Sequence, residues 1–246
     1  CGWFYRRDAD TFKQIPGTPI AYWLGVGSTL SFSEGKPLSE MGSLAQGLKC
    51  GDTDRFVRCW HECAARNVLD ELGMPSKLKW HFMLDGGDFR KWYGNVVDVV
   101  NWENDGDEIR TNKNDEGRVR SRVQNERYYH RGDTLTWSAL TSGPISVRTC
   151  IFNSLCGGAG YYIVPSDSDD RYGLLALLNS SVSQYLKFAL SPTLNNEVGD
   201  LKRIPVCRDD SMAPVISDLS VKSVFLSKTD WDSFETSWDF KRHPLL

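Results

Sequence analysis

Two stretches of the chain hold residue types suited to contact with nucleic acid. The first, GGDFRKWYGNVVDVVNWENDG from Gly86 to Gly106, sets Arg90, Lys91, Trp92 and Tyr93 in a row between glycines. Basic side chains pair with phosphates or read guanine edges, and aromatic rings stack on bases. The competing interpretation is an exposed hairpin whose aromatic rings cover a small sheet.

The second stretch is the most basic part of the sequence. From Arg110 to Arg131 seven basic residues face three acidic ones, so the net charge is about +4 there and about −7 over the rest of the chain. The basic residues Arg118, Arg120 and Arg122 are the candidates for DNA contact in this stretch. A solvated loop is the competing interpretation.

A third candidate patch surrounds a glycine loop, in which Lys49, Thr53 and Arg55 flank Gly51. The turn residues at 51–54 predict a loop between two strands, within a strand–loop–strand unit over 44–60. Loops on a rigid sheet hold recognition side chains in fixed positions. All three patches fall in roughly the first half of the chain.

The overall composition is that of a folded protein without a membrane span. The 246 residues are 40% hydrophobic, 25% charged and 12% aromatic. The net charge of −3 argues against a nonspecific DNA coat. No apolar run approaches the roughly 20 residues needed to cross a bilayer, and no signal peptide is visible. Because the chain begins at Cys1 without methionine, we expect an excised segment of a longer protein.

Several catalytic signatures are missing from the sequence. It has no glycine-rich turn for a methyl donor, no Asn/Asp-Pro-Pro-aromatic tetrapeptide, no Gly-Lys-Ser/Thr phosphate loop, no Gly-x-Ser-x-Gly and no His-Glu-x-x-His. The run Cys156–Gly160 is rich in glycine but precedes a strand, so we predict a loop that bends the sheet. We therefore expect no catalytic residue in the chain.

Metal chemistry receives little support. Cys59, His61 and Cys63 in CWHEC lack a second paired cluster, so we predict buried cysteines flanking a surface histidine rather than a zinc site. The seven cysteines are odd in number and irregularly spaced, which indicates reduced thiols in a cytoplasm. The acidic runs beginning at Asp52 and Asp167 are interpreted as helix caps and turns, although a degenerate nuclease using Asp52 and Asp54 stays open.

The hydrophobic periodicity predicts an α/β (α+β) fold with a curved mixed or antiparallel sheet and flanking helices. Helices are predicted over 20–24, 64–72 and 171–190. Strands are predicted over 78–83, 89–93, 96–102, 135–140, 145–152, 161–164 and 200–206. We divide the chain into a domain over 1–213 and a helical, aromatic docking segment over 214–246.

Five segments together resemble one protein family. In order along the chain they are LKCGDTDRFVRCWHE, KWHFMLDGGDFRKWYGNVVDVVNWENDG, YYHRGDTLTWSAL, LLALLNSSVSQYLKFALSPTLNNEVGDLKRIPV and DWDSFETSWDFKRHPLL. They strongly resemble the region downstream of the catalytic domain in PglX-type adenine-specific DNA methyltransferases of BREX phage-defence systems. The first and fourth also resemble the looser Gly-x-x-x-Gly-x-x-x-x-Phe loop and Leu-Leu-Asn-Ser helix of recognition domains in type IIG restriction-modification enzymes and type I specificity subunits.

The resemblance implies a noncatalytic target recognition domain that helps choose the sequence of double-stranded DNA. An upstream domain of the parent chain would bind S-adenosylmethionine and methylate adenine N6. The resemblance also implies a DNA-facing role for the Gly51 loop. Cys50 departs from the hydroxyl residue expected before Gly51, which puts a hydroxyl contact to phosphate at that position in doubt.

A protein-protein scaffold that docks other defence components is the alternative function. It would use the Trp-rich character of the chain, and it would keep its partners after charge reversal at Arg90 and Lys91. A DNA reader would instead lose methylation in the full-length enzyme.

Overall fold

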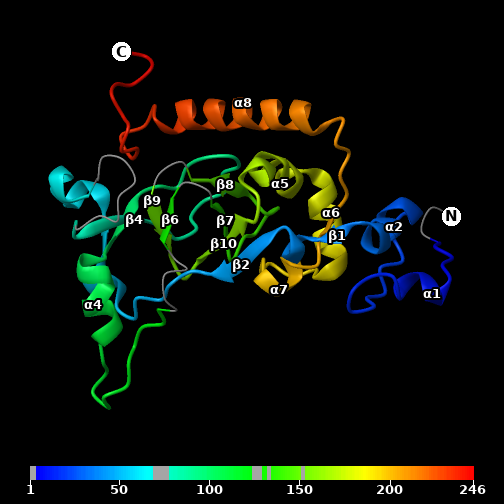
Figure 1. Cartoon of the computed structure of the whole chain (residues 1–246), viewed down its shortest axis with the longest axis horizontal. Helices are drawn as coiled ribbons and strands as arrows, with labels where there is room; N and C mark the ends of the chain where they lie inside the picture. The colour runs from blue at the N-terminus through cyan, green and yellow to red at the C-terminus, as the bar shows by residue number, and fades with distance from the viewer. Residues whose placement is uncertain (1–3, 69–77, 124–128, 132–133, 151–152) are drawn as a thin grey trace.

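The computed structural model describes residues 4–68, 78–123, 129–131, 134–150 and 153–246. Its strands form two larger sheets and one small one (Figure 1). The four-stranded sheet has the order β2-β10-β7-β8 and consists of Gly42–Gln46, Gly160–Pro165, Leu135–Ser138 and Val147–Thr149. The five-stranded sheet has the order β3-β5-β4-β9-β6 and consists of Val57–Cys59, Asp98–Asn101, Trp80–Leu84, Asn153–Cys156 and Tyr129–Arg131. A two-stranded sheet pairs β1 (Lys36–Pro37) with β11 (Pro205–Val206).

The strand pairing confirms the predicted fold class. Neighbouring strands are antiparallel throughout, except that β4 and β9 are parallel. Each larger sheet has its own apolar cluster. Trp137, Ile163 and Leu175 lie in the cluster of the four-stranded sheet, and Val99 and Leu155 lie in that of the five-stranded sheet. Burial of these side chains supplies the main stabilising term of the fold.

A tight glycine turn joins the two larger sheets. It runs from Cys156, the last residue of β9, to Gly160, the first residue of β10, which confirms the predicted loop before a strand. A Cβ on Gly160 would lie 2.0 Å from the Leu84 carbonyl oxygen, and one on Gly47 would lie 2.1 Å from the Gly157 oxygen. Only glycine permits these backbone approaches.

Helices surround the sheets. They are α1 (Ala9–Phe12), α2 (Val26–Glu34), α3 (Thr53–Phe56), α4 (Glu103–Thr111), α5 (Arg171–Asn179), α6 (Ser181–Leu190), α7 (Val198–Leu201) and α8 (Ala213–Trp231). Short 3-10 turns occur at Leu38–Glu40, Trp60–Glu62, Ala65–Asn67 and Ser168–Asp170. Figure 1 shows α8 along one side of the molecule, beside α5, and α1 and α2 at one end.

The helix predicted over 171–190 is two helices. The backbone of Ser180 takes an extended conformation, with ψ of 158°, and its side chain accepts a hydrogen bond from the Ser183 amide. Ser180 therefore caps α6, a role that serine fills well, and the single-helix prediction was wrong at this residue. Helix α8 begins at Ala213 and has Pro214 in its first turn, and the division of the chain at 213/214 stays a prediction.

Three other element predictions were wrong. Residues 20–24 form no helix, because the chain turns there and α2 begins only after Gly25, whose extended backbone forms the N-cap. Residues 89–93 form no strand beyond one bridge from Trp92, whose φ of 75° is incompatible with a strand. Residues 200–206 begin with the end of α7 and only then enter β11.

The helix predicted over 64–72 is described only in part. Ala65–Asn67 forms a 3-10 turn, and the rest of that prediction lies mainly outside the described residues. The predicted caps are confirmed, since Asp52 accepts a hydrogen bond from the Arg55 amide and Asp167 accepts one from the Asp169 amide.

The cysteine prediction is partly corrected. Cys59 and Cys63 are half-buried rather than buried, because Trp60–Glu62 forms a 3-10 turn at the surface, whereas His61 is exposed as predicted. Burial raises the pKa of both thiols. Cys50, Cys59, Cys63 and Cys207 are free thiols. Across those same residues, no His, Cys, Asp and Glu side chains gather in a group of three suited to a metal ion.

Within the described ranges, no helix combines the length and the apolar character required to cross a bilayer.

Candidate nucleic-acid interface

The structure brings two of the three predicted patches together. The Lys49 amide donates to the Arg122 carbonyl oxygen at 3.1 Å, and the Arg122 amide donates to the Lys49 oxygen at 2.8 Å. Sequence spacing gave no reason to expect this pairing, because more than 70 residues separate the two partners. We call the exposed side chains of Lys49, Arg120 and Arg122 the basic face.

A hairpin over residues 112–122, the basic arm, carries two members of this face. The Arg120 amide donates to the Asn112 oxygen at 2.9 Å, and the Asn114 amide donates to the Arg118 oxygen at 2.9 Å. At the tip, Asn114 Oδ1 accepts from the amides of Glu116 and Arg118. These bonds fix the turn, and Figure 1 shows the arm extending away from α4. The arm is therefore a preformed projection of the backbone.

Gly51 holds the arm against its loop. Its φ is +80°, and a Cβ there would lie 2.7 Å from the backbone carbon and oxygen of Arg120. A side chain at this position would both strain the backbone and collide with the arm. The structure thus gives Gly51 a positioning role, in addition to the direct DNA contact predicted for it.

The cations near this surface differ in how they are paired. Lys49 and Arg120 are exposed and have no ion-pair partner among the described residues, whereas the Arg122 guanidinium donates to Gln46 Oε1. Arg118 lies 3.4 Å from Glu116, with 82% of its side chain exposed. Arg55 lies 3.4 Å from Glu108, also at the surface. Exposed pairs of this kind contribute little to stability and are readily exchanged for phosphate.

The start of α3 explains the departure at Cys50. The Cys50 side chain is buried, and its Sγ lies 3.9 Å from the Thr53 hydroxyl oxygen. Position 50 therefore offers no exposed hydroxyl to a phosphate. Thr53 is exposed at the first position of α3 and keeps its predicted place beside the Gly51 loop.

The glycine turn 156–160 packs against one residue of the basic face, Lys49. The stem of Lys49 packs against Gly158, where a Cβ would lie 3.0 Å from Lys49 Cγ. Asp85 Oδ1 accepts the Ala159 amide at 2.7 Å. Burial raises the pKa of the Asp85 carboxyl, and the backbone hydrogen bonds from Ala159 and Gly160 oppose that shift. The turn is thereby held in place by one half-buried acid.

The first predicted patch has a different surrounding. Arg90 Nη2 lies 2.5 Å from Asp230 Oδ2, and its guanidinium carbon lies 5.1 Å from the centre of the Trp231 ring. Lys91 Nζ donates to the Asn179 carbonyl oxygen at 2.7 Å. Both cations are half-buried and point to residues of α5 and α8. We call residues 90–93 the anchor segment.

The two aromatic residues of the anchor segment also face inward. Tyr93 is 3% exposed, and burial raises the pKa of its hydroxyl. Trp92 is half-buried and packs against the cluster of the four-stranded sheet. Tyr93 is therefore covered, and Trp92 is covered in part. The sequence interpretation missed this because the partners of the segment lie about 90 and 140 residues downstream.

A buried arginine holds the loop before the anchor segment. The Arg148 guanidinium donates to the carbonyl oxygens of Gly86 and Arg90 at 3.2 and 3.4 Å. Burial, followed by the charge of Arg90, lowers the pKa of Arg148 to about 10, so it stays charged at neutral pH. The anchor segment is therefore an internal part of the fold.

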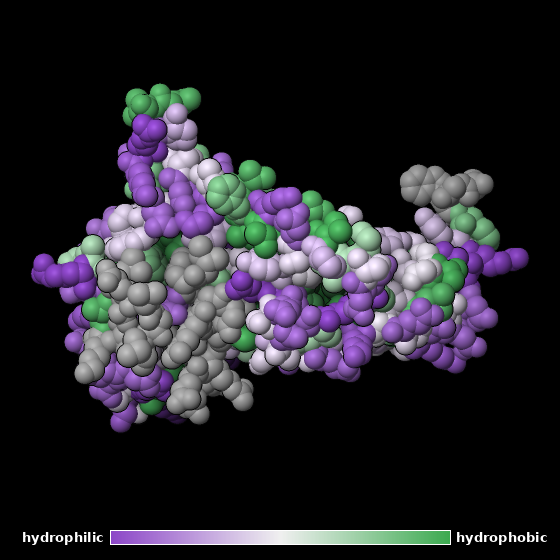
Figure 2. Space-filling view, turned by 45° about the horizontal axis from the view of Figure 1, so that its top comes forward, coloured by the Kyte–Doolittle hydropathy of each residue, from purple (hydrophilic) through white to green (hydrophobic). Residues whose placement is uncertain are grey.

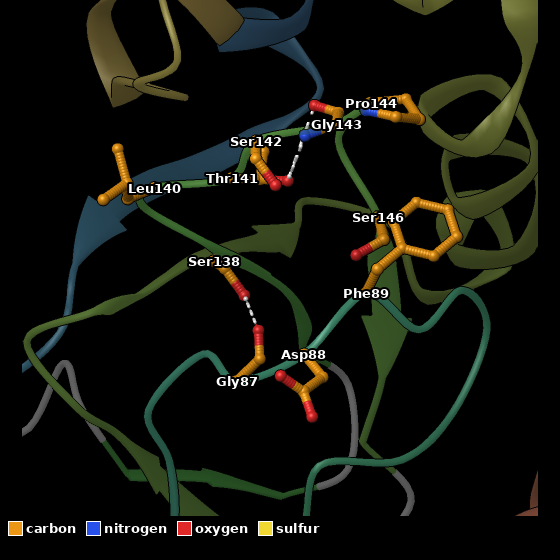
Figure 3. A pocket seen from close by; sticks show the side chains of 10 residues that line it. All are labelled: Gly87, Asp88, Phe89, Ser138, Leu140, Thr141, Ser142, Gly143, Pro144 and Ser146. Carbon is orange, nitrogen blue, oxygen red and sulfur yellow. Dashed lines mark hydrogen bonds between the residues drawn. The ribbon is translucent and has the colours of Figure 1, made fainter.

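Sequence reasoning also missed a half-open cavity of about 530 Å³ on the same loop (Figure 3). Its lining consists of Gly87, Asp88, Phe89, Ser138, Leu140, Thr141, Ser142, Gly143, Pro144 and Ser146. The Ser138 hydroxyl donates to the Gly87 oxygen at 3.0 Å, and Thr141 bonds to Gly143. The lining contains hydroxyls, three exposed apolar side chains and one acid, and it lacks a paired nucleophile and base.

The chain is similar to part of two known methyltransferases. No protein-family model matches it. It is 35% identical over 243 residues to the adenine-specific methyltransferase BrxX of Escherichia coli O9:H4 (strain HS), a match that covers 96% of this chain and 19% of that protein. It is 34% identical over 248 residues to the adenine-specific methyltransferase PglX of Lacticaseibacillus casei (strain Zhang), covering 98% and 20% respectively.

The chain thus spans about one fifth of the length of each of these two relatives. Nearly all of it aligns with both, which confirms the resemblance drawn from the five sequence segments. Over nearly its whole length, the chain is similar to one segment of PglX-type proteins.

Proposed function

We propose that this segment recognises the DNA sequence for an adenine-specific DNA methyltransferase, and that it does so without catalytic residues of its own. The observation that carries the proposal is the backbone pairing of Lys49 with Arg122. It sets the Gly51 loop beside the basic arm and gathers three exposed cations on an otherwise acidic chain. Phosphate contact needs such a cluster, which can form locally although the chain as a whole has a net charge of −3.

We expect residues at different positions of this surface to contact different parts of the DNA. Lys49, Arg120 and Arg122 would bind phosphates, since they lie on the framework that fixes the arm. Arg118, at the tip of the arm, would reach a base edge, because a two-stranded ribbon fits the major groove of B-DNA. Arg55 and Thr53 would border the contact from α3. The anchor segment would take no part, since its cations already have partners within the chain.

The rest of the parent protein would supply the chemistry. The relatives are named as adenine-specific methyltransferases, and this chain matches a fifth of them. S-adenosylmethionine would bind in another domain of the parent, which would methylate adenine and close the other side of the DNA. The setting we propose is the cytoplasm, in phage defence or restriction-modification of the type IIG kind.

The test uses the full-length parent protein and duplex DNA that carries its methylation site. We expect Lys49→Ala with Arg120→Ala to weaken binding by about tenfold to a hundredfold and to reduce the salt slope by about 2. Methylation should fall in parallel. The matched control is Lys13→Ala with Lys202→Ala, which removes two exposed cations remote from the basic face.

Unchanged affinity and unchanged salt slope in the first variant would overturn the proposal. Retained DNA binding and methylation combined with loss of a protein partner would instead favour the scaffold function. Charge reversal at Arg90 and Lys91 does not separate the two, because both side chains hold the fold together.

A further inference from the structure

The outward side of α8 carries an exposed apolar stripe. Met212, Val215, Leu219 and Leu226 follow one another along it, with Lys222 between the last two. The successive spacings are three, four, three and four residues, and Leu219 and Leu226 are 57% and 67% exposed. We call these five residues the seam. Figure 2 shows hydrophobic side chains along this part of the surface, interrupted by hydrophilic ones.

The inward side of α8 is already occupied. Ser220 and Val224 are buried, and the Ser227 hydroxyl lies 3.0 Å from the carbonyl oxygens of both Lys91 and Tyr93. At 100° per residue, Val224 falls about 160° from Leu226 and 140° from Leu219 around the helix. The rotation of α8 is therefore fixed by its inner contacts, and the seam faces away from them.

The spacing identifies the kind of surface that fits the seam. Apolar residues alternating at three and four positions form the contact line of two helices packed side by side. Single exposed apolar residues are ordinary on a protein surface, but four on one side of a helix, interrupted only by Lys222, are typical of a contact site. A second helix would bury all four side chains at once.

The charge in the seam narrows the choice of helix. Lys222 Nζ lies 2.7 Å from Asp218 Oδ2 on the same helix. A second copy of α8 packed in parallel would place Lys222 against Lys222, which is unfavourable. A helix with a carboxylate or amide at that level would pair with it. About four fifths of the length of each relative lies outside the segment matched here, so the parent chain has ample length for such a helix.

We propose that the seam binds a helix from the remainder of the parent chain, with apolar residues at the same spacing and an acidic or amide side chain opposite Lys222. The contact would fix the orientation of this segment relative to the rest of the protein. It does not depend on the DNA-binding role, because no residue of the basic face belongs to it.

The test is site-specific photocrosslinking in the full-length parent, with p-benzoylphenylalanine in place of Leu219. We expect a crosslink to a peptide of the same chain outside these 246 residues, at a yield independent of protein concentration. The matched control places the same group at Val221, which is exposed on α8 but lies outside the seam. The control should give at most about a fifth of that yield, since it faces solvent.

A second measurement covers the case in which the bulky group prevents docking. Leu219→Gln with Leu226→Gln keeps helix propensity, and it should raise hydrogen exchange at least about threefold in one helix outside this segment, whereas Val221→Gln should not. A crosslink between two copies, or to another protein, would overturn the proposal. So would the absence of both the crosslink and the exchange change.

Discussion

The anchor segment and the basic arm both carry basic residues, but these residues have opposite surroundings. Arg90 and Lys91 are half-buried against α8 and α5, with a carboxylate and a carbonyl oxygen as partners. Arg120 is exposed without an ion-pair partner in the described part of the chain, and Arg118 has only a surface pair. A basic residue becomes structural where a distant element supplies an acceptor, and local composition does not reveal that acceptor.

A glycine without a Cβ makes room for the neighbouring arginine in both regions. Gly94, with φ of +127°, leaves room for Arg90 and Trp231, since a Cβ there would lie 2.6 Å from Arg90 Nε. Gly51 leaves room for the Arg120 backbone. The first glycine permits a cation to be covered, and the second permits a cation to be presented.

The largest effect is expected at Gly51. Gly51→Ala should lower the free energy of unfolding by about 3 kcal/mol. The alanine would have to take a left-handed backbone conformation, and its Cβ would push the arm away from the loop. Duplex affinity of the parent should fall at least about tenfold with it, as measured by titration. The control is Gly117→Ala, where φ is +78° and no atom lies within 4 Å of the added Cβ.

Gly117→Ala should lower the free energy of unfolding by about 1 kcal/mol, because it adds only the strain of a left-handed backbone. Equal losses of stability in the two variants would show that the arm can move away from the added Cβ at no cost in free energy, and that Gly51 does not position it.

A smaller effect is expected at Arg90. Arg90→Ala removes the ion pair with Asp230 and the contact with the Trp231 ring, so the unfolding free energy should fall by about 2 kcal/mol in a denaturant titration. The matched variant Arg118→Ala should change stability by less than about 0.5 kcal/mol, because its pair is fully at the surface.

The same two variants should reverse their order in DNA binding. At a temperature where both are folded, Arg118→Ala should weaken duplex affinity of the parent and Arg90→Ala should not. If only Arg90→Ala lowered the affinity for duplex DNA, the anchor segment and not the basic arm would be the part that contacts DNA.

Much of the fold could be predicted from local signals. Strands β4, β5, β7 and β10 follow apolar, β-branched and aromatic runs, and the turn at 156–160 follows its glycines. The break at Ser180 was not predictable from the apolar spacing, which continues through it with Leu178 and Val182. A side-chain cap there outweighs the periodicity.

The candidate site was predictable only as separate patches. The Gly51 loop and the residues at 118–122 were both indicated by charge and turn chemistry, but their pairing depends on a long-range backbone contact. The surroundings of Arg90 depend on α8, about 140 residues away. Tertiary contacts of this range leave no mark on local sequence patterns.

The most direct test compares the two regions in one protein. In the full-length parent, the rates of lysine acetylation are measured with and without duplex DNA carrying the methylation site. The Lys49 amine should react fast when free and at least about fivefold slower on DNA, because phosphate would cover it. Lys91 should react slowly in both states, since Asn179 already accepts from its amine, and the remote Lys13 should react fast in both. Protection of Lys91 with no change at Lys49 would show that the anchor segment, and not the basic face, contacts DNA.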